Sequence, residues 1–330
     1  MKLVIAEKPS VAISIAKVIG ATSKKDGYYE GNGYKVSWCV GHLVQMANPD
    51  KYDEKYTKWN LSDLPIIPSE YKYEVSKSTK KQFNILKKLM NEKDIDTIIN
   101  ACDAGREGES IFRLVYQMTG SKKNMQRLWI SSMEDSAIRD GFNHLKDGSY
   151  YDNLFESAKA RAIADWLVGM NISRLYSCLY KQNYSVGRVQ TPTLAMIVNR
   201  DEEINKFKKE KYYTVDVLLD GFALSSNRID DKYEAEKLLN EIGDNIEIKE
   251  VTQKEKKTSP ELPFDLITLQ RECNKYFGYS AKQTLDYAQS LYEKKLITYP
   301  RTDSRNLTED MIVNIVNNIL GKNDFDEQRI

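Results

Sequence analysis

The stretch Asp96–Met118, DTIINACDAGREGESIFRLVYQM, decides the fold of the N-terminal part of the chain. Residues 97–102 form a short apolar, β-branched run, which predicts a strand buried on both faces. From Arg106 or Glu107 onward the apolar residues recur at helical spacing, at Ile111, Phe112, Val115 and Met118. A buried strand that leads directly into a helix is typical of an open α/β sheet, in which sites lie beyond the carboxyl ends of the strands.

Three acids crowd the turn between this strand and this helix. Asp103, Glu107 and Glu109 lie within seven residues, and Gly105 and Gly108 relax the backbone between them. A single acid there would only complement the helix dipole. Three acids, together with an arginine and two glycines, favour a functional site.

A second strand–acid–helix unit opens the chain. Residues 3–6 are apolar, Glu7-Lys8-Pro9-Ser10 follows, and a helical pattern then runs to Gly20. If both strands share one parallel sheet, Glu7 and Lys8 emerge at the same edge as Asp103. Mg²⁺ prefers one or two carboxylates with waters and phosphate oxygens, so this rim can hold a divalent metal beside a phosphate. Taken alone, Glu7 and Lys8 would indicate only an ordinary surface loop.

Composition sets broad limits on the protein class. The chain has 330 residues, 41% of them apolar and 29% charged, which predicts two or three domains of a globular protein. No apolar run approaches a membrane span, and the N-terminus starts directly with a strand, so we expect no signal peptide. Four scattered cysteines without a CxxC pair indicate reduced thiols rather than a zinc site. A net charge of +1 leaves any nucleic-acid surface to local patches.

Further patterns extend the first domain. Residues 34–40 and 128–131 are predicted strands, residues 82–90 and 136–145 are predicted helices, and residues 41–68 are loop-like. This alternation predicts a doubly wound sheet up to about residue 145.

Residues 155–192 combine basic and aromatic side chains. Five basic residues face only Glu156 and Asp165, and four aromatic residues are interleaved with them: Lys159, Arg161, Arg174, Lys181 and Arg188, with Trp166, Tyr176, Tyr180 and Tyr184. This pattern suits a nucleic-acid strand, because cations meet phosphates and rings stack on bases. The alternative is an amphipathic helix with core aromatics. The following Ser185-Val-Gly-Arg-Val-Gln190-Thr-Pro, just before a helix, can offer backbone N–H groups to phosphates.

The C-terminal part carries a tyrosine, Tyr299, that is followed directly by a proline and an arginine. A strand over residues 213–223 and a linker over 258–263 precede two predicted helices, 266–277 and 281–292. Tyr299-Pro300-Arg301 then follows. A tyrosine is a poor nucleophile at a pKa of about 10 unless its proton is assisted away, and a guanidinium stabilises phenolate and clamps phosphate. A lone tyrosine among 21 is otherwise a structural residue.

Five motifs in order make the pattern specific. They are Ala6-Glu-Lys-Pro-Ser10, Asp103-Ala-Gly-Arg-Glu-Gly-Glu109, Ala164-Asp-Trp-Leu-Val-Gly169, Ser185-Val-Gly-Arg-Val-Gln-Thr-Pro192 and Leu296-Ile-Thr-Tyr-Pro-Arg-Thr-Asp-Ser304. With them the chain resembles the type IA DNA topoisomerases, most closely the bacterial topoisomerase III branch, from Met1 to about Thr308.

The resemblance implies a Rossmann-like, doubly wound α/β Toprim domain followed by mostly helical and mixed α/β segments. The implied divisions are a Toprim domain at 1–148, a helical DNA-binding segment at 149–210, a β-rich hinge segment at 211–260 and a winged-helix-like tyrosine domain at 261–330. The implied whole is a ring around DNA.

The resemblance also implies an activity. One DNA strand is cleaved through a transient 5′-phosphotyrosyl bond, another strand passes, and the first is resealed, with Mg²⁺ and without ATP. The implied partner is single-stranded DNA, and the implied protein is a monomer in the bacterial cytoplasm, associated with the nucleoid.

Residue roles carry over by motif. Tyr299 is the implied nucleophile, assisted by Glu7, Lys8 and Arg301. Glu7, Asp103 and Glu107 are the implied metal ligands. The implied DNA path consists of Trp59, Arg161, Asp165, Trp166, Arg174, Ser185, Val186, Gly187, Arg188, Val189, Gln190 and Arg301.

Two departures modify these expectations. The Toprim pattern is often Asp-x-Asp-x-Glu, but Gly105 replaces the middle acid, so we expect one Mg²⁺ with more water ligands. The family core normally continues for hundreds of residues past the tyrosine, whereas this sequence stops at Ile330. We therefore expect a truncated chain that binds single-stranded DNA but relaxes or decatenates it poorly. The alternatives are another Toprim enzyme, such as a primase or nuclease, and a DNA-binding remnant without catalysis.

Overall fold

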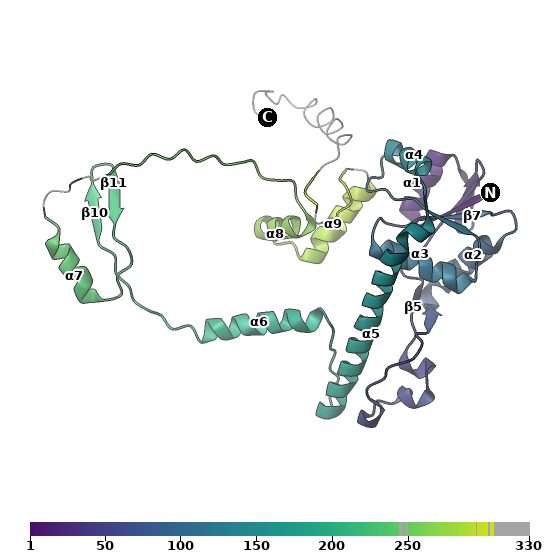
Figure 1. Ribbon diagram of the computed structural model, residues 1–330, viewed down its shortest axis with the longest axis horizontal. Helices are drawn as coiled ribbons and strands as arrows, with labels where there is room; N and C mark the ends of the chain where they lie inside the picture. The colour runs from purple at the N-terminus through teal and green to yellow at the C-terminus, as the bar shows by residue number, and fades with distance from the viewer. Residues whose placement is uncertain (244–246, 248–249, 295, 303, 307–330) are drawn as a thin grey trace. The chain divides into compact units, whose positions relative to one another are not determined.

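The computed structural model describes residues 1–243, 247, 250–294, 296–302 and 304–306. These residues form two compact units. The first unit comprises Met1–Arg188 and the described residues from Leu262 onward, and the second comprises Val189–Glu261. Figure 1 colours the chain by residue number.

A seven-stranded mixed sheet organises the first unit, in the order β2-β3-β4-β1-β7-β8-β9. Its central strands β4, β1, β7 and β8 are parallel, whereas β2, β3 and β9 join antiparallel at the edges. The strands are β1 Lys2–Ala6, β2 Ser23–Lys25, β3 Tyr28–Gly31, β4 Tyr34–Trp38, β7 Thr97–Ala101, β8 Asn124–Arg127 and β9 Lys146–Asp147. The predicted Toprim-type α/β sheet is confirmed, with antiparallel edges added.

Helices cover both faces of this sheet (Figure 1). One hydrophobic cluster joins Leu3 and Ile5 of β1 to α2 (Lys80–Asn91) and α3 (Arg106–Thr119). The other joins Val4 and Ala6 to α1 (Pro9–Ile19) and α4 (Asp135–Asn143). Successive side chains of β1 therefore point into two separate cores on opposite faces of the sheet. Burying each large aliphatic side chain contributes roughly 1.5–3 kcal/mol to the stability of the fold.

Two predictions about this unit were wrong in detail. The strand expected over residues 128–131 is β8, Asn124–Arg127, because pairing with β7 selects a stretch that has no apolar run. The segment expected to be a loop, 41–68, contains β5 (Val44–Met46), which pairs with β6 (Tyr73–Val75). Short 3₁₀ helices complete this region and its neighbours at Pro49–Lys51, Glu54–Thr57, Leu61–Asp63, Lys77–Thr79 and Gly148–Tyr151.

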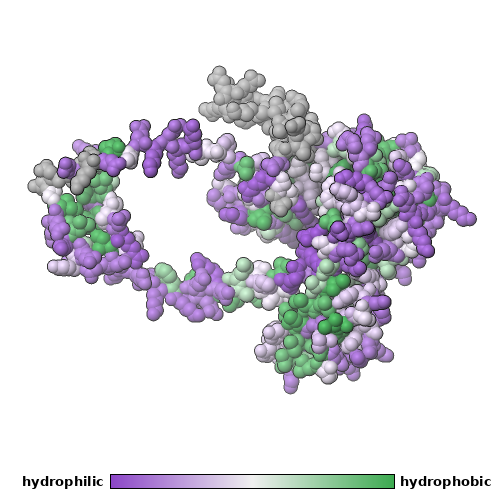
Figure 2. Space-filling view, viewed as in Figure 1, coloured by the Kyte–Doolittle hydropathy of each residue, from purple (hydrophilic) through white to green (hydrophobic). Residues whose placement is uncertain are grey.

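The 29-residue helix α5, Asp152–Tyr180, extends from the sheet region. It packs on α3, and its Asn171 side chain bonds both the N–H and the carbonyl of Ile66, at 2.6 and 3.0 Å. The 41–72 segment is thereby held along α5. Hydrophobic surface gathers around the far end of this helix, where Leu175 and Leu179 are exposed (Figure 2).

The second unit contains α6 (Gln190–Asn205), a hairpin of β10 (Asp216–Leu219) and β11 (Phe222–Ser225), and α7 (Lys232–Glu241). The single strand expected over 213–223 is wrong, because Gly221 adopts a φ of +88° and turns the chain back.

After the second unit, two short helices belong again to the first unit. α8 spans Leu266–Phe277 and α9 spans Ala281–Glu293, close to the predicted bounds. Asp265 and Ser280 cap their N-termini, since each side chain accepts a hydrogen bond from a backbone N–H three residues on. Within the described residues, no helix has the length and apolar content to cross a membrane.

Candidate active site

The carboxyl ends of β1 and β7 place two acids at one edge of the sheet. These strands are adjacent and parallel, with Ala6 opposite Ala101, so the residues after each strand emerge together. The Asp103 N–H donates to Glu7 Oε2 at 3.4 Å. Burial and the Asp103 charge raise the pKa of Glu7, whose side chain is only 7% exposed. The prediction that Glu7 and Asp103 share an edge is therefore confirmed.

The turn that presents Asp103 is closely packed. A Cβ at Gly108 would collide with the Asp103 carbonyl oxygen, so this position requires glycine. Gly105, in contrast, faces open space in extended backbone, as the residue that precedes α3.

A buried arginine anchors this turn, and sequence reasoning missed it. Arg127 donates to the carbonyls of Cys102 and Asp103 at 2.6 and 2.7 Å, and its Nε lies 3.1 Å from Glu109 Oε2. Glu109 is 1% exposed and also accepts from Arg113 Nε at 2.8 Å. Glu109 is therefore occupied by two arginines. If the strand had been predicted at Asn124–Arg127, Arg127 would have stood out as a charged residue at the end of a strand within the sheet.

Glu107 turns toward a histidine that the sequence analysis did not single out. His42 Nε2 lies 2.5 Å from Glu107 Oε1, which raises the pKa of His42 and lowers the pKa of Glu107. His42 is one of only two histidines in the chain, and it follows a glycine just beyond a strand, which was the available signal.

The stretch after α9, described over residues 296–302 and 304–306 and called the tyrosine segment below, brings Tyr299 against the same acids. Its ring packs edge-on against Tyr292 of α9, with centroids 5.5 Å apart, and its hydroxyl hydrogen-bonds the Asp103 carboxylate. Burial, Asp103 and Glu7 raise the pKa of Tyr299 well above its ordinary value, and Arg301 opposes them. A cavity of about 420 Å³ borders Tyr299, Asp103 and Arg301.

The two predicted phosphate-binding cations differ in their surroundings. Lys8 Nζ lies 3.9 Å from Glu293 Oε1 at the end of α9, and each side chain is about a third exposed. Arg301 is exposed and forms no ion pair with any carboxylate that the structure describes.

The donor set fits a magnesium ion with few protein ligands. Glu7 and Asp103 are neighbouring carboxylates whose mutual repulsion a cation would relieve. Among the described residues, however, no three His, Cys, Asp or Glu side chains converge as a metal cage, and Glu107 is engaged by His42. Two carboxylates completed by water and phosphate oxygens match the preference of Mg²⁺.

Most predicted DNA-path residues on α5 make contacts within the protein. Trp166 Nε1 donates to the Ala47 carbonyl at 3.1 Å. Arg174 is 7% exposed, donates to the Tyr56 carbonyl at 2.9 Å and lies over the Trp59 ring at 5.2 Å. Trp59 remains 45% exposed. The first two side chains therefore hold the 41–72 segment on α5, whereas Trp59 offers a surface.

A charge pair ties the following loop to the same helix. Arg188 binds Asp165 through two nitrogens, at 2.5 and 3.2 Å, and Arg161 Nε lies 3.9 Å from Asp165. The N–H of Val186 donates to Ser173 Oγ at 2.9 Å. The remaining predicted residues follow in the same stretch: Ser185 and Gly187 in this loop, and Val189 and Gln190 at the start of the second unit.

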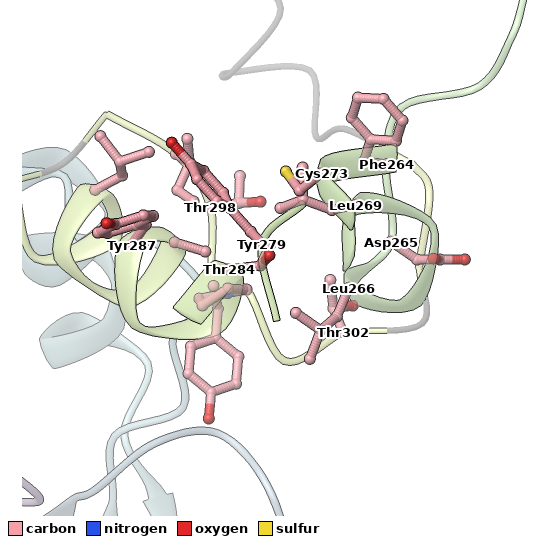
Figure 3. A pocket seen from close by; sticks show the side chains of 15 residues that line it. Phe264, Asp265, Leu266, Leu269, Cys273, Tyr279, Thr284, Tyr287, Thr298 and Thr302 are labelled. Atoms are coloured by element: carbon pink, nitrogen blue, oxygen red, sulfur yellow. The ribbon is translucent and has the colours of Figure 1, made fainter. Parts of the chain in front are cut away.

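An apolar pocket of about 290 Å³ also borders the tyrosine segment (Figure 3). Leu269 and Cys273 of α8, Tyr287 of α9 and Tyr299 itself line it. Tyr299 and Thr302 therefore border both this pocket and the polar cavity.

Known proteins match this arrangement. Residues 2–133 match the Toprim domain family, and residues 149–329 match a family described as DNA topoisomerase. DNA topoisomerase 3 of Staphylococcus epidermidis is 46% identical over 315 residues, and that of Bacillus anthracis is 47% identical over 320. Each match covers 94% of this chain, but the chain spans only 44% of the length of those relatives.

A solved structure shares the fold. Full-length topoisomerase I from Thermotoga maritima superposes with a TM-score of 0.69 at 26% identity, over 97% of this chain and 53% of that one. The family match covers more than half of the sequence and includes Tyr299. The chain therefore belongs to the type IA DNA topoisomerase family, with a Toprim domain over residues 2–133.

Proposed function

We propose that the chain cleaves one DNA strand through Tyr299, forming a transient 5′-phosphotyrosyl bond, and reseals it after another strand has passed. The observation that carries this proposal is the hydrogen bond between the Tyr299 hydroxyl and Asp103, which joins the tyrosine segment to the acidic edge of the Toprim sheet. The two acids disfavour the phenolate, so Tyr299 starts as a neutral phenol whose hydroxyl already faces a carboxylate that can accept its proton.

The proposed step balances without an outside energy source. Tyr299 Oη bonds to phosphorus, and the bond from phosphorus to the 3′ oxygen breaks. Asp103, which accepts the tyrosine hydrogen bond, takes the phenol proton, and Glu7 supplies a proton to the leaving 3′ oxygen. The raised pKa of Glu7 favours the protonated form that such a donor needs. Reversal of the same step reseals the strand, because the phosphotyrosine keeps the phosphodiester energy.

Cations at the site would stabilise the charge on the transferring phosphate. Arg301 is exposed at the cavity, and the loose Lys8–Glu293 pair can release Lys8 toward a phosphate. Asp103, and Glu7 when it is ionised, would hold Mg²⁺, which supplies further positive charge beside the phosphate when bound.

The remaining assignments are parts of the same proposal. Single-stranded DNA is the proposed substrate, running past Trp59, Arg161 and the 185–190 loop. The four-part division at residues 148, 210 and 260 is the proposed domain organisation. A monomer acting in the cytoplasm, at the nucleoid, is the proposed biological state.

The test is covalent capture of DNA. An end-labelled single-stranded oligonucleotide is incubated with the chain and Mg²⁺, and the mixture is denatured and separated. We expect an adduct with the wild type and with Tyr287→Phe, a matched control on α9, but not with Tyr299→Phe. An adduct that survives Tyr299→Phe would overturn the assignment of the nucleophile. Salt-sensitive binding without any adduct would instead support a non-catalytic DNA-binding chain.

A further inference from the structure

A charged clasp joins the tyrosine segment to the start of α8. Arg305 Nε donates to Asp265 Oδ2 at 2.8 Å, and Arg305 Nη2 lies 2.8 Å from the same oxygen and 2.5 Å from Thr268 Oγ1. The other oxygen of Asp265 caps α8 by accepting from the Thr268 N–H at 2.7 Å. One carboxylate therefore serves the helix and the segment that follows Tyr299.

A backbone bond reinforces this clasp close to the tyrosine. The Leu266 N–H donates to the Thr302 carbonyl at 3.3 Å. In Figure 3, Leu266 and Thr302 lie together at the edge of the apolar pocket, and Asp265 points away from it. The tyrosine segment is thus tied to α8 after Tyr299, while Tyr299 itself rests on Tyr292 of α9.

The position of this tie matters because the segment borders two cavities. The apolar pocket of about 290 Å³ and the polar cavity of about 420 Å³ both include Tyr299 and Thr302 in their walls. Packing against the protein is therefore incomplete at these residues, and a further tie can fix the position of the segment. Displacement of a reacting atom by about 1 Å can cost on the order of 100-fold in rate.

Arg305 differs from Arg301 in what its charge does. Arg301 is exposed and acts on the acids and on Tyr299, whereas the guanidinium of Arg305 is bound by Asp265 and Thr268. Arg305 also lines the cavity beside Tyr299. Its ion pair with Asp265 is therefore part of the site and not a surface ion pair remote from it.

We propose that Asp265 and Arg305 are positioning residues, whose clasp holds the Tyr299 hydroxyl at the Asp103 end of the cavity. This inference rests on the proposed strand cleavage by Tyr299. The clasp acts through the Leu266–Thr302 backbone bond on the described residues 299–302, and the Arg305 guanidinium is held by Asp265 and Thr268. The clasp therefore controls the rate of adduct formation rather than the affinity for DNA.

The test uses variants that separate the clasp from the helix cap. Asp265→Ser keeps a good N-cap but cannot bind the Arg305 guanidinium. Arg305→Ala removes the other partner, and Arg271→Ala removes an exposed arginine of α8 as the matched control. For each full-length variant we would measure the adduct-formation rate at saturating oligonucleotide, the Kd for the same oligonucleotide, and Tm.

We expect both clasp variants to slow adduct formation about tenfold or more, with Kd changed less than twofold and a cooperative unfolding transition retained at a modestly lower Tm. The double variant should be no slower than the slower single variant, because both changes break one link. Arg271→Ala should match the wild type. Clasp variants that form adducts at the wild-type rate would overturn the inference, and so would a parallel loss of rate and DNA affinity.

A second readout does not depend on catalysis. With 3-fluorotyrosine placed at position 299 alone, we expect one sharp ¹⁹F resonance in the wild type, and a shifted or broadened one in Asp265→Ser and Arg305→Ala. An unchanged resonance in both would overturn the clasp. A wild type that forms no adduct but responds in this way would overturn the proposed function and leave the clasp standing.

Discussion

The Tyr299 hydroxyl hydrogen-bonds the Asp103 carboxylate, although the two residues belong to stretches of chain separated by the whole second unit. The acid raises the pKa of the phenol and Arg301 lowers it. Strand cleavage by this tyrosine would therefore begin from a neutral phenol, with its proton already shared with an acceptor.

This balance of charges predicts two opposite shifts. Asp103→Asn should lower the pKa of Tyr299, because a negative neighbour is removed, and Arg301→Gln should raise it, because a positive neighbour is removed. A ¹⁹F titration of 3-fluorotyrosine at position 299 measures both. Asp286→Asn on α9 serves as the control and should leave the titration unchanged. Shifts of the same sign in the two variants would contradict the electrostatic account.

Metal binding should discriminate between the acids of the turn. Glu7→Gln and Asp103→Asn should each weaken Mg²⁺ binding, since they remove half of a two-carboxylate site. Glu107→Gln should weaken it far less, because Glu107 is bound to His42. Calorimetric titration of the DNA-free chain with MgCl₂ measures this order. Equal losses for all three variants would show that Glu107 leaves His42 to join the metal.

The buried arginine predicts a large loss of stability. Arg127→Ala removes the ion pair with Glu109 and the donor to the Cys102 and Asp103 carbonyls of the active-site turn, and we expect a destabilisation of about 3–5 kcal/mol. Arg161→Ala removes an exposed arginine and should cost less than about 0.5 kcal/mol. Urea unfolding followed by circular dichroism compares them. A loss below about 1 kcal/mol for Arg127→Ala would contradict its anchoring role.

The two glycines of the turn should respond differently to a methyl group. Gly108→Ala pushes a Cβ into the Asp103 carbonyl oxygen, and we expect it to cost about 1–3 kcal/mol and to displace Asp103. Gly105→Ala meets open space in extended backbone and should be nearly neutral. Urea unfolding and the adduct assay together measure both effects. A tolerated Gly108→Ala with full adduct formation would contradict the close packing of this turn.

The clasp predicts a pH dependence of definite sign. Hydrogen bonds from Thr268 and from Arg305 hold the pKa of Asp265 at about 2, below its ordinary value of 3.8. A depressed carboxyl pKa stabilises the fold above the ordinary value, and this stabilisation is lost as the pH falls from about 4 toward 2. The difference in Tm between the wild type and Asp265→Asn should therefore be constant from pH 7 to 5 and shrink below pH 4. A difference that grows on acidification would contradict this sign.

The sequence was informative where local patterns decide structure. The apolar runs at 3–6 and 97–102 each had to be a buried strand, and parallel pairing then placed Glu7 beside Asp103 without further information. The capped helices α8 and α9 were equally legible, because Asp265, Gly278 and Ser280 mark their ends.

Long-range contacts were not legible in the same way. Nothing in a linear pattern indicates that Arg127 binds the carbonyls of a turn some twenty-five residues earlier, or that His42 meets Glu107. The basic and aromatic residues of α5 illustrate the opposite case. Their types suited a DNA strand, but Trp166 and Arg174 satisfy backbone carbonyls of the 41–72 segment.

The joint between the nucleophile and its acids has a mechanical consequence. Tyr292 packs into the core cluster that includes Val4 and Ala6 of β1, Lys8 faces Glu293 across 3.9 Å, and the Tyr299 hydroxyl hydrogen-bonds Asp103. These are side-chain contacts, and none of them is a rung of the sheet. Separation of this joint would therefore leave every strand pairing of the sheet intact, and a DNA strand bound to Tyr299 would then move away from the Toprim edge with its phosphate still attached.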